Sequence, residues 1–100
     1  MIIVNVRIES TPEAVEAMRD TILSMQTATL EEEGCEDYSF SVELANPGAL
    51  RVTERWASQA ELSAHFQTPH MATFQAAMQA NPPVAVDAHF YDATEIDRPQ

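Results

Sequence analysis

The sequence contains no lysine, one cysteine and two glycines, and each scarcity excludes a class of chemistry. Without lysine, no Schiff base can form on a side-chain amine. Two isolated glycines, Gly34 and Gly48, cannot make a dinucleotide fingerprint or a phosphate-binding loop. The single cysteine, Cys35, excludes an intramolecular disulfide and fits a reducing compartment. An oxidoreductase with this sequence would lack the usual nucleotide-binding motifs.

Positive charge is also scarce, because 16 acidic residues stand against five arginines and the net charge is -11. This charge repels nucleic acid and anionic membrane surfaces, so we expect neither as a partner. The longest apolar runs are too short to cross a bilayer, and the first residues lack the pattern of a signal peptide. We therefore expect one cytoplasmic domain over residues 1–100.

Hydrophobic periodicity predicts four strands, over residues 1–9, 37–44, 50–56 and 84–94, with a turn at residues 45–49. A long helix follows a cap at Ser10 or Thr11, with Glu13 completing a capping box, and closes near Gly34. Its buried face is expected to comprise Val15, Met18, Ile22, Met25 and Thr29. The acidic run that follows, Glu31 to Glu33, is interpreted as solvated and without a role in a site.

A second helical region, residues 58–78, begins with a Ser58/Glu61 capping box and is broken before Pro69. The order strand, helix, strand, strand, helix, strand predicts an α+β, ferredoxin-like fold: a four-stranded antiparallel sheet with helices on one face. The uncovered face carries the side chains Ile3, Ala85, His89 and Tyr91. We expect a second copy to cover it, which makes the protein a homodimer.

The segment "ERWASQAELSAHFQTPHMATF", residues 54–74, gathers the candidate chemical groups. Glu54 and Trp56 point to the same side of a strand, so a carboxylate is directed at an apolar layer, where it needs a partner or a proton. His65 and His70 flank the helix break, where both rings could enter a widened gap and exchange protons near neutral pH. Such a gap suits a flat, aromatic, acidic substrate.

Three simpler interpretations compete with this one. A histidine on a helix surface is usually solvated, a tryptophan on a strand is usually part of the core, and Glu54 could pair with Arg7 or Arg51. Metal binding is not expected, because His65 and His70 are five residues apart across a break and no zinc or facial-triad spacing is present.

Three segments, "EEEGCEDY" at residues 31–38, "ERWAS" at 54–58 and "LSAHFQTPHMATF" at 62–74, resemble the antibiotic biosynthesis monooxygenase superfamily in order and spacing. The resemblance is to its quinol-monooxygenase-like branch. It implies a dimeric α+β barrel that oxygenates a quinol or phenolic small molecule with O2 and without a cofactor. It further implies His65 as the base, Glu54 as its partner or an alternative base, and His70 as a second catalytic imidazole. The implied walls of the substrate pocket are Trp56, Phe66, Met25, Phe74 and Tyr38.

Other branches of the superfamily fit less well. Val52 and Leu62 stand where the anthrone-oxygenating branch has Asn and Tyr, which argues against polyketide tailoring. His65 and Gln75 stand where the haem-degrading branch has Trp and His. An isomerase of a phosphorylated molecule is disfavoured by the acidity and the absence of lysine. The alternative from another class is a non-catalytic dimeric module for small-molecule binding or stress. An enzyme predicts a cavity of roughly 300 Å³ or more beside Trp56; a module predicts none.

Overall fold

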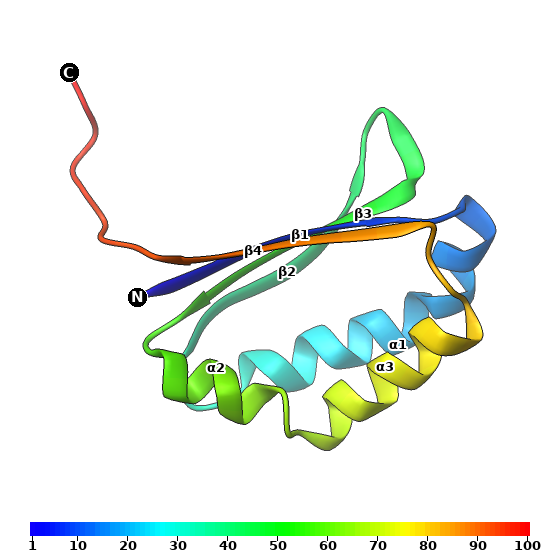
Figure 1. Cartoon of the computed structure of the whole chain (residues 1–100), viewed down its shortest axis with the longest axis horizontal. Helices are drawn as coiled ribbons and strands as arrows, with labels where there is room; N and C mark the ends of the chain where they lie inside the picture. Colours follow the sequence, from blue (N-terminus) through cyan, green and yellow to red (C-terminus); the bar gives the residue numbers. More distant parts are fainter.

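A computed structural model describes all 100 residues and shows a four-stranded antiparallel sheet with three helices on one face (Figure 1). The elements in chain order are β1 (Ile2–Glu9), α1 (Pro12–Leu30), β2 (Cys35–Glu43), β3 (Asn46–Trp56), α2 (Gln59–His65), α3 (Pro69–Ala80) and β4 (Ala85–Asp92). The strands lie in the order β2-β3-β1-β4, so the predicted ferredoxin-like α+β fold is confirmed. None of the helices has the length and apolar character that a membrane span requires.

Helix α1 buries the face that its sequence predicts, namely Val15, Met18, Ile22, Met25 and Thr29. Its cap is Thr11, whose side chain accepts a hydrogen bond from the backbone N–H of Ala14. The predicted capping box is wrong, because Glu13 then stands at the second helical position, whereas the box requires an acid at the third. The helix ends at Leu30, and Gly34, at φ +79°, turns the chain into β2.

The connection between β2 and β3 differs from the predicted turn at residues 45–49. The turn comprises Leu44 and Ala45, and β3 already begins at Asn46. Pairing shifts from Val42 with Leu50 to Glu43 with Asn46, so residues 47–49 form an irregularity in the strand. This part of β3 lies against the start of α1, because the backbone N–H of Ser10 donates to the carbonyl of Gly48 over 2.8 Å.

The predicted break in the second helical region is confirmed: α2 ends at His65 and α3 begins at Pro69. Thr68 joins the two helices, since its hydroxyl donates to the carbonyl of His65 (2.8 Å) and accepts from the backbone N–H of Met71 (3.2 Å). At the start of α2, Ser58 is the cap residue but makes no side-chain bond to the helix backbone. Its hydroxyl donates to the Glu61 carboxylate instead.

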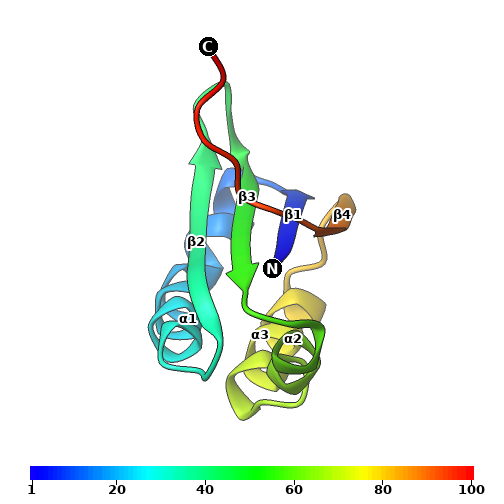
Figure 2. The same ribbon diagram turned by 90° about the vertical axis from the view of Figure 1, so that its left-hand side faces the viewer.

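The inner face of the sheet is covered unevenly. Figure 2 shows α1 beneath β2, with α2 and α3 beside it on the side of β1 and β4. The core lies between α1 and the first three strands, and its largest fully buried side chains include Trp56, Met18, Met25 and Val4. Strand β4 is the edge of the sheet next to β1, and all its residues are exposed. Apolar side chains of β4 that face the helices, such as Val86 and Phe90, are therefore only half covered.

The outer face of the sheet carries an ion-paired cluster. The guanidinium of Arg7 donates two hydrogen bonds to Glu43, at 2.6 and 3.2 Å, and that of Arg51 donates one at 2.7 Å. These three side chains lie on neighbouring strands. The alternative that Glu54 pairs with Arg7 or Arg51 is therefore wrong, because both arginines bind Glu43.

Candidate active site

A cavity of about 190 Å³ lies between the sheet and the second helical region. Of its 15 lining residues, 13 are hydrophobic, and the other two are Glu54 and His65. The walls come from all four strands and from the α2–α3 region: Val4, Val6, Ile8, Tyr38, Phe40, Val52, Phe66, Met71, Phe74, Met78, Val86, Ala88 and Phe90. The site is therefore an apolar chamber that offers one imidazole and one carboxyl group.

The position and size of this chamber differ from the expected ones. The volume is smaller than the roughly 300 Å³ expected for a bicyclic ring, and Trp56 is absent from its lining. Trp56 is a fully buried core residue behind the chamber wall, where it contacts the wall residues Glu54 and His65. A larger hollow of about 310 Å³ lies beside Ile2, Leu62 and Phe66, but it contains no histidine, and Asp92 is its only carboxylate.

His65 is the last residue of α2, and its side chain is almost fully buried. Aromatic rings surround the imidazole: the ring centroids of Trp56, Tyr38 and Phe66 lie 4.9, 5.6 and 5.7 Å from its own. A buried polar ring needs a hydrogen-bond partner. Nδ1 of His65 finds one in the carboxylate Oε2 of Glu32, at 2.7 Å.

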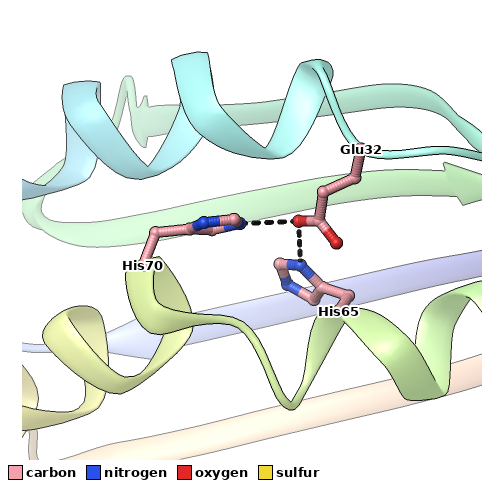
Figure 3. A group of neighbouring side chains, drawn as sticks. All are labelled: Glu32, His65 and His70. Carbon is pink, nitrogen blue, oxygen red and sulfur yellow. Dashed lines mark hydrogen bonds and ion pairs between the residues drawn. The ribbon is translucent and has the colours of Figure 1, made fainter.

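The same oxygen of Glu32 holds a second ring. Nε2 of His70, in the first turn of α3, lies 2.7 Å from Glu32 Oε2 (Figure 3). The three side chains come from the turn after α1, the end of α2 and the start of α3. Glu32 therefore ties the end of α1 to both sides of the helix break. We call Glu32, His65 and His70 the two-histidine cluster.

The shared carboxylate determines which nitrogen of each ring carries a proton. An ionised carboxylate only accepts hydrogen bonds, so Nδ1 of His65 and Nε2 of His70 must both donate. In a neutral imidazole the other nitrogen is then an acceptor. Nε2 of His65 lies on the side of the ring away from Glu32 and has no hydrogen-bond partner in the chain (Figure 3). His65 thus presents a free basic nitrogen.

Glu54 is the second polar wall of the chamber. Its Oε1 accepts a hydrogen bond from the indole Nε1 of Trp56, two residues along the same strand, at 2.9 Å. Burial raises the pKa of the Glu54 carboxyl, and this outweighs the lowering by the indole hydrogen bond and by nearby His65. The expected pairing of Glu54 with His65 is not formed, because His65 uses Nδ1 for Glu32.

Two neighbouring acidic groups have raised pKa values for related reasons. Burial, followed by the negative charges of Glu54 and Glu32, raises the pKa of the Tyr38 hydroxyl well above its ordinary value. Burial and the same two carboxylates raise the pKa of the Cys35 thiol to about 11. Tyr38 therefore stays neutral as a wall of the chamber, and Cys35 is a poor nucleophile at neutral pH.

The structure brings five of the eight candidate residues together in the chamber, and the three exceptions are His70, Met25 and Trp56. Tyr38, Phe66 and Phe74 line the chamber along with His65 and Glu54. His70 reaches the chamber only through Glu32, and Met25 is a fully buried core residue that does not line it. Contact of Trp56 or Met25 with a substrate stays a prediction that this arrangement does not favour.

Glu32 is the residue that sequence reasoning missed. The interpretation of Glu31 to Glu33 as a solvated run is wrong for its middle member, which bonds two imidazoles and is mostly buried. A signal was available: a carboxylate at the C-terminal end of a helix is destabilised by the helix dipole, so an acid placed there calls for a compensating donor. The histidines across the helix break supply two.

The two-histidine cluster also contains ligand atoms of the kinds that bind metals. The carboxylate oxygen and the two ring nitrogens all lie within 4.8 Å of one another. The expectation of no metal site depended on the spacing of the histidines in sequence. The fold overcomes that spacing by bringing a third residue, Glu32 from the turn after α1, between them.

Comparison with known proteins gives consistent matches. The family model described as antibiotic biosynthesis monooxygenase matches residues 1–77. The chain is 32% identical over 74 residues to the "Probable quinol monooxygenase YgiN" of Escherichia coli K12, covering 66% of this chain and 71% of that protein.

Solved structures share the fold over nearly the whole chain. A crystal structure from Deinococcus radiodurans, described as an antibiotic biosynthesis monooxygenase, superposes with a TM-score of 0.90 at 23% identity and covers 100% of this chain and 99% of that one. A conserved protein from Methanosarcina mazei Go1 superposes with a TM-score of 0.85 at 27% identity, over 93% and 92% of the two chains.

Proposed function

Because this chain belongs to the antibiotic biosynthesis monooxygenase family, we propose that it oxygenates a small quinol or other phenolic compound with O2, without flavin or metal. The name of the Escherichia coli relative suggests the quinol. The observation that carries the proposal is the apolar chamber whose only strongly polar walls are His65 and Glu54. An apolar slot with a base is what deprotonation of a phenol requires.

The size of the chamber supports a substrate with one aromatic ring. A cavity of about 150 Å³ lined by apolar side chains accommodates benzene, and this chamber measures about 190 Å³. The half-covered β4 side chains Val86 and Phe90 leave one wall open. A substituent on the ring would extend past that edge, so a monocyclic hydroquinone fits better than a rigid polycyclic one.

The proposed reaction begins with a proton transfer. Nε2 of His65 accepts the proton of a substrate hydroxyl, and the resulting phenolate gives one electron to O2. The superoxide and the substrate radical combine, which forms a carbon–oxygen bond at the ring. The hydroperoxide then loses water as its O–O bond breaks and the ring C–H proton leaves. The balance is one hydroquinone and one O2 giving one hydroxyquinone and one water.

Each polar residue has a distinct role in this proposal. His65 is the base, as in the family-based prediction. Glu32 is a positioning residue: it fixes the Nδ1–H tautomer of His65 and stabilises the imidazolium that forms. His70 holds Glu32 from the other side and does not touch substrate. Glu54, with its raised pKa, is the alternative base.

Oxygen uptake tests the proposal. The wild-type protein is mixed with a panel of monocyclic hydroquinones and one naphthohydroquinone, and O2 consumption is followed with an electrode against the uncatalysed rate. We expect faster uptake with a monocyclic compound and its loss in H65A. The matched control is H89A, since His89 is an exposed histidine on β4. If wild type gives only the uncatalysed rate across the panel, the oxygenase proposal is wrong and the non-catalytic module is favoured.

We further propose that a second copy covers the outer face of the sheet, making a homodimer. This face carries Ile3, with half-exposed Tyr91 beside it on β4, and the Arg7–Glu43–Arg51 cluster lies farther along the strands. Light scattering after size exclusion should give twice the chain mass, and a charge in the middle of the face, as in I3D, should give a monomer. A wild-type monomer at micromolar concentration would contradict this.

A further inference from the structure

We infer that the two-histidine cluster is a binding site for a divalent transition-metal ion, with Glu32, His65 and His70 as ligands. Two imidazoles and one carboxylate are a ligand set typical of zinc and non-haem iron sites. Figure 3 shows both ring nitrogens directed at the same oxygen of Glu32, and the three ligand atoms lie within 4.8 Å of one another. This inference concerns binding alone and does not rest on the proposed oxygenase activity.

The distances within the cluster are close to those a metal requires. Ligand bonds of 2.0–2.2 Å in the tetrahedral geometry of zinc place neighbouring ligand atoms about 3.4 Å apart. Each ring nitrogen now lies 2.7 Å from Glu32 Oε2. Binding therefore needs the Glu32 oxygen to withdraw from each ring nitrogen by less than about 1 Å, which rotation of the flexible Glu32 side chain permits. Three protein ligands leave at least one coordination position for water.

The backbone around the cluster is fixed independently of any ion. His65 and His70 are held at the ends of two helices that the Thr68 hydroxyl joins. Glu32 lies in the turn after α1, and its backbone N–H donates to the carbonyl of Thr29. Glu32 is 33 residues from His65 and 38 residues from His70 in the sequence. The unfolded chain therefore does not hold the three ligands together. A bound ion should thus stabilise the fold.

The electrostatic surroundings favour a cation. Glu31 and Glu33 flank the ligand Glu32, and the whole chain has a net charge of -11. Arg55 is paired with Glu36 at 3.3 Å, so its charge is already neutralised. No arginine pairs with Glu32, whose ion-pair partners are the two histidines. An ion with two positive charges would therefore offset the negative charge of this acidic segment.

Binding requires the protons within the cluster to move. A metal takes the lone pairs of His65 Nδ1 and His70 Nε2, so each neutral ring must carry its proton on its other nitrogen. For His65 that nitrogen is Nε2. A metal-loaded cluster would therefore convert the free basic nitrogen of His65 into a donor.

Zinc titration of the untagged protein tests the inference. Isothermal titration calorimetry with Zn²⁺ should show one site per chain, and the melting temperature should rise with Zn²⁺ concentration. The variants E32Q and H70A should each weaken Zn²⁺ binding about tenfold or more, and H89A should leave it unchanged. Circular dichroism verifies that the variants are folded, and Co²⁺ absorption provides a second measurement, since ligand-field bands should appear in wild type and be lost in H70A.

Three results would overturn the inference. They are the absence of Zn²⁺ binding and of Co²⁺ bands in wild type, Zn²⁺ affinity that E32Q and H70A leave unchanged, or a loss of affinity in H89A as large as in H70A. Oxygen uptake enters none of these measurements. A protein that binds zinc but consumes no O2 would support the metal site while contradicting the oxygenase proposal.

Discussion

The indole N–H of Trp56 donates to the Glu54 carboxylate at 2.9 Å, and both side chains are buried on the same face of β3. Residues two apart on a strand point the same way, so the indole can reach back to the carboxylate. No cation pairs with Glu54. The hydrogen bond is thus the main local compensation for a carboxyl group whose burial raises its pKa.

Replacing Trp56 by Phe should show the worth of this bond. The W56F variant keeps an aromatic ring but leaves the buried carboxylate unsatisfied, which costs about 1–3 kcal/mol of stability. Urea unfolding measures the loss. In an E54Q background the cost of W56F should be at least about 1 kcal/mol smaller, because an unpaired amide is less costly to bury than an unpaired carboxylate. Equal costs in both backgrounds would show that lost packing, and not the hydrogen bond, is responsible.

Glu32 offers a test of how His65 is positioned. In E32Q the amide no longer selects the Nδ1–H tautomer or stabilises an imidazolium, so kcat for oxygen uptake should fall about 100-fold or more. KM should change little, since Glu32 does not line the chamber. The matched control is E33Q, the exposed neighbour with the same charge. An equal fall in both variants would point to general charge effects.

Glu43 should contribute to stability in a pH-dependent way. Hydrogen bonds from Arg7 and Arg51 lower the pKa of the Glu43 carboxyl to about 2. Because the folded-state pKa is below the unfolded-state value, the contribution is complete above about pH 5 and is lost as the pH falls toward 2. Wild type should exceed E43Q in stability at neutral pH, and the two should converge near pH 2. Urea unfolding across this range, with E16Q as an exposed control, checks the trend; a constant difference would contradict it.

The thiol of Cys35 should react slowly while the protein is folded. Burial and the charges of Glu32 and Glu54 raise its pKa to about 11, against 9.0 for the unperturbed group. At pH 8 the thiolate fraction is then about 100-fold smaller than in the unfolded chain. Iodoacetamide labelling followed by mass spectrometry should show a rate difference of about this size. Equal rates for folded and urea-unfolded protein would contradict the raised pKa.

Much of the fold could be predicted because it is encoded locally. The spacing of Val15, Met18 and Ile22 identifies the buried face of α1, and Pro69 identifies the helix break. The turn before β3 was misplaced, since Pro47 and Gly48 have the composition of a turn. Contact with Ser10, the residue that directly follows β1, keeps Pro47 and Gly48 in β3 instead. Long-range packing overrode a local preference there.

The candidate site was predicted only in part for the same reason. His65 and Glu54 stood out, because an imidazole beside a helix break and a carboxylate on an apolar strand face are unusual locally. The partner of His65 could not be chosen from the sequence, where Glu54 is 11 residues away and Glu32 is 33. The choice depends on where the end of α1 lies relative to α2, which is a property of the tertiary structure.

Because Glu32 lies between two rings, one oxygen atom both orients the His65 imidazole and connects the end of α1 to the break between α2 and α3. If His65 is the base, as proposed, the residue that positions this base also holds the three helices together. A homologue that replaced Glu32 would also need new contacts between its helices. The apolar residues near β4 carry no such constraint, so substitutions there can change which substrate fits.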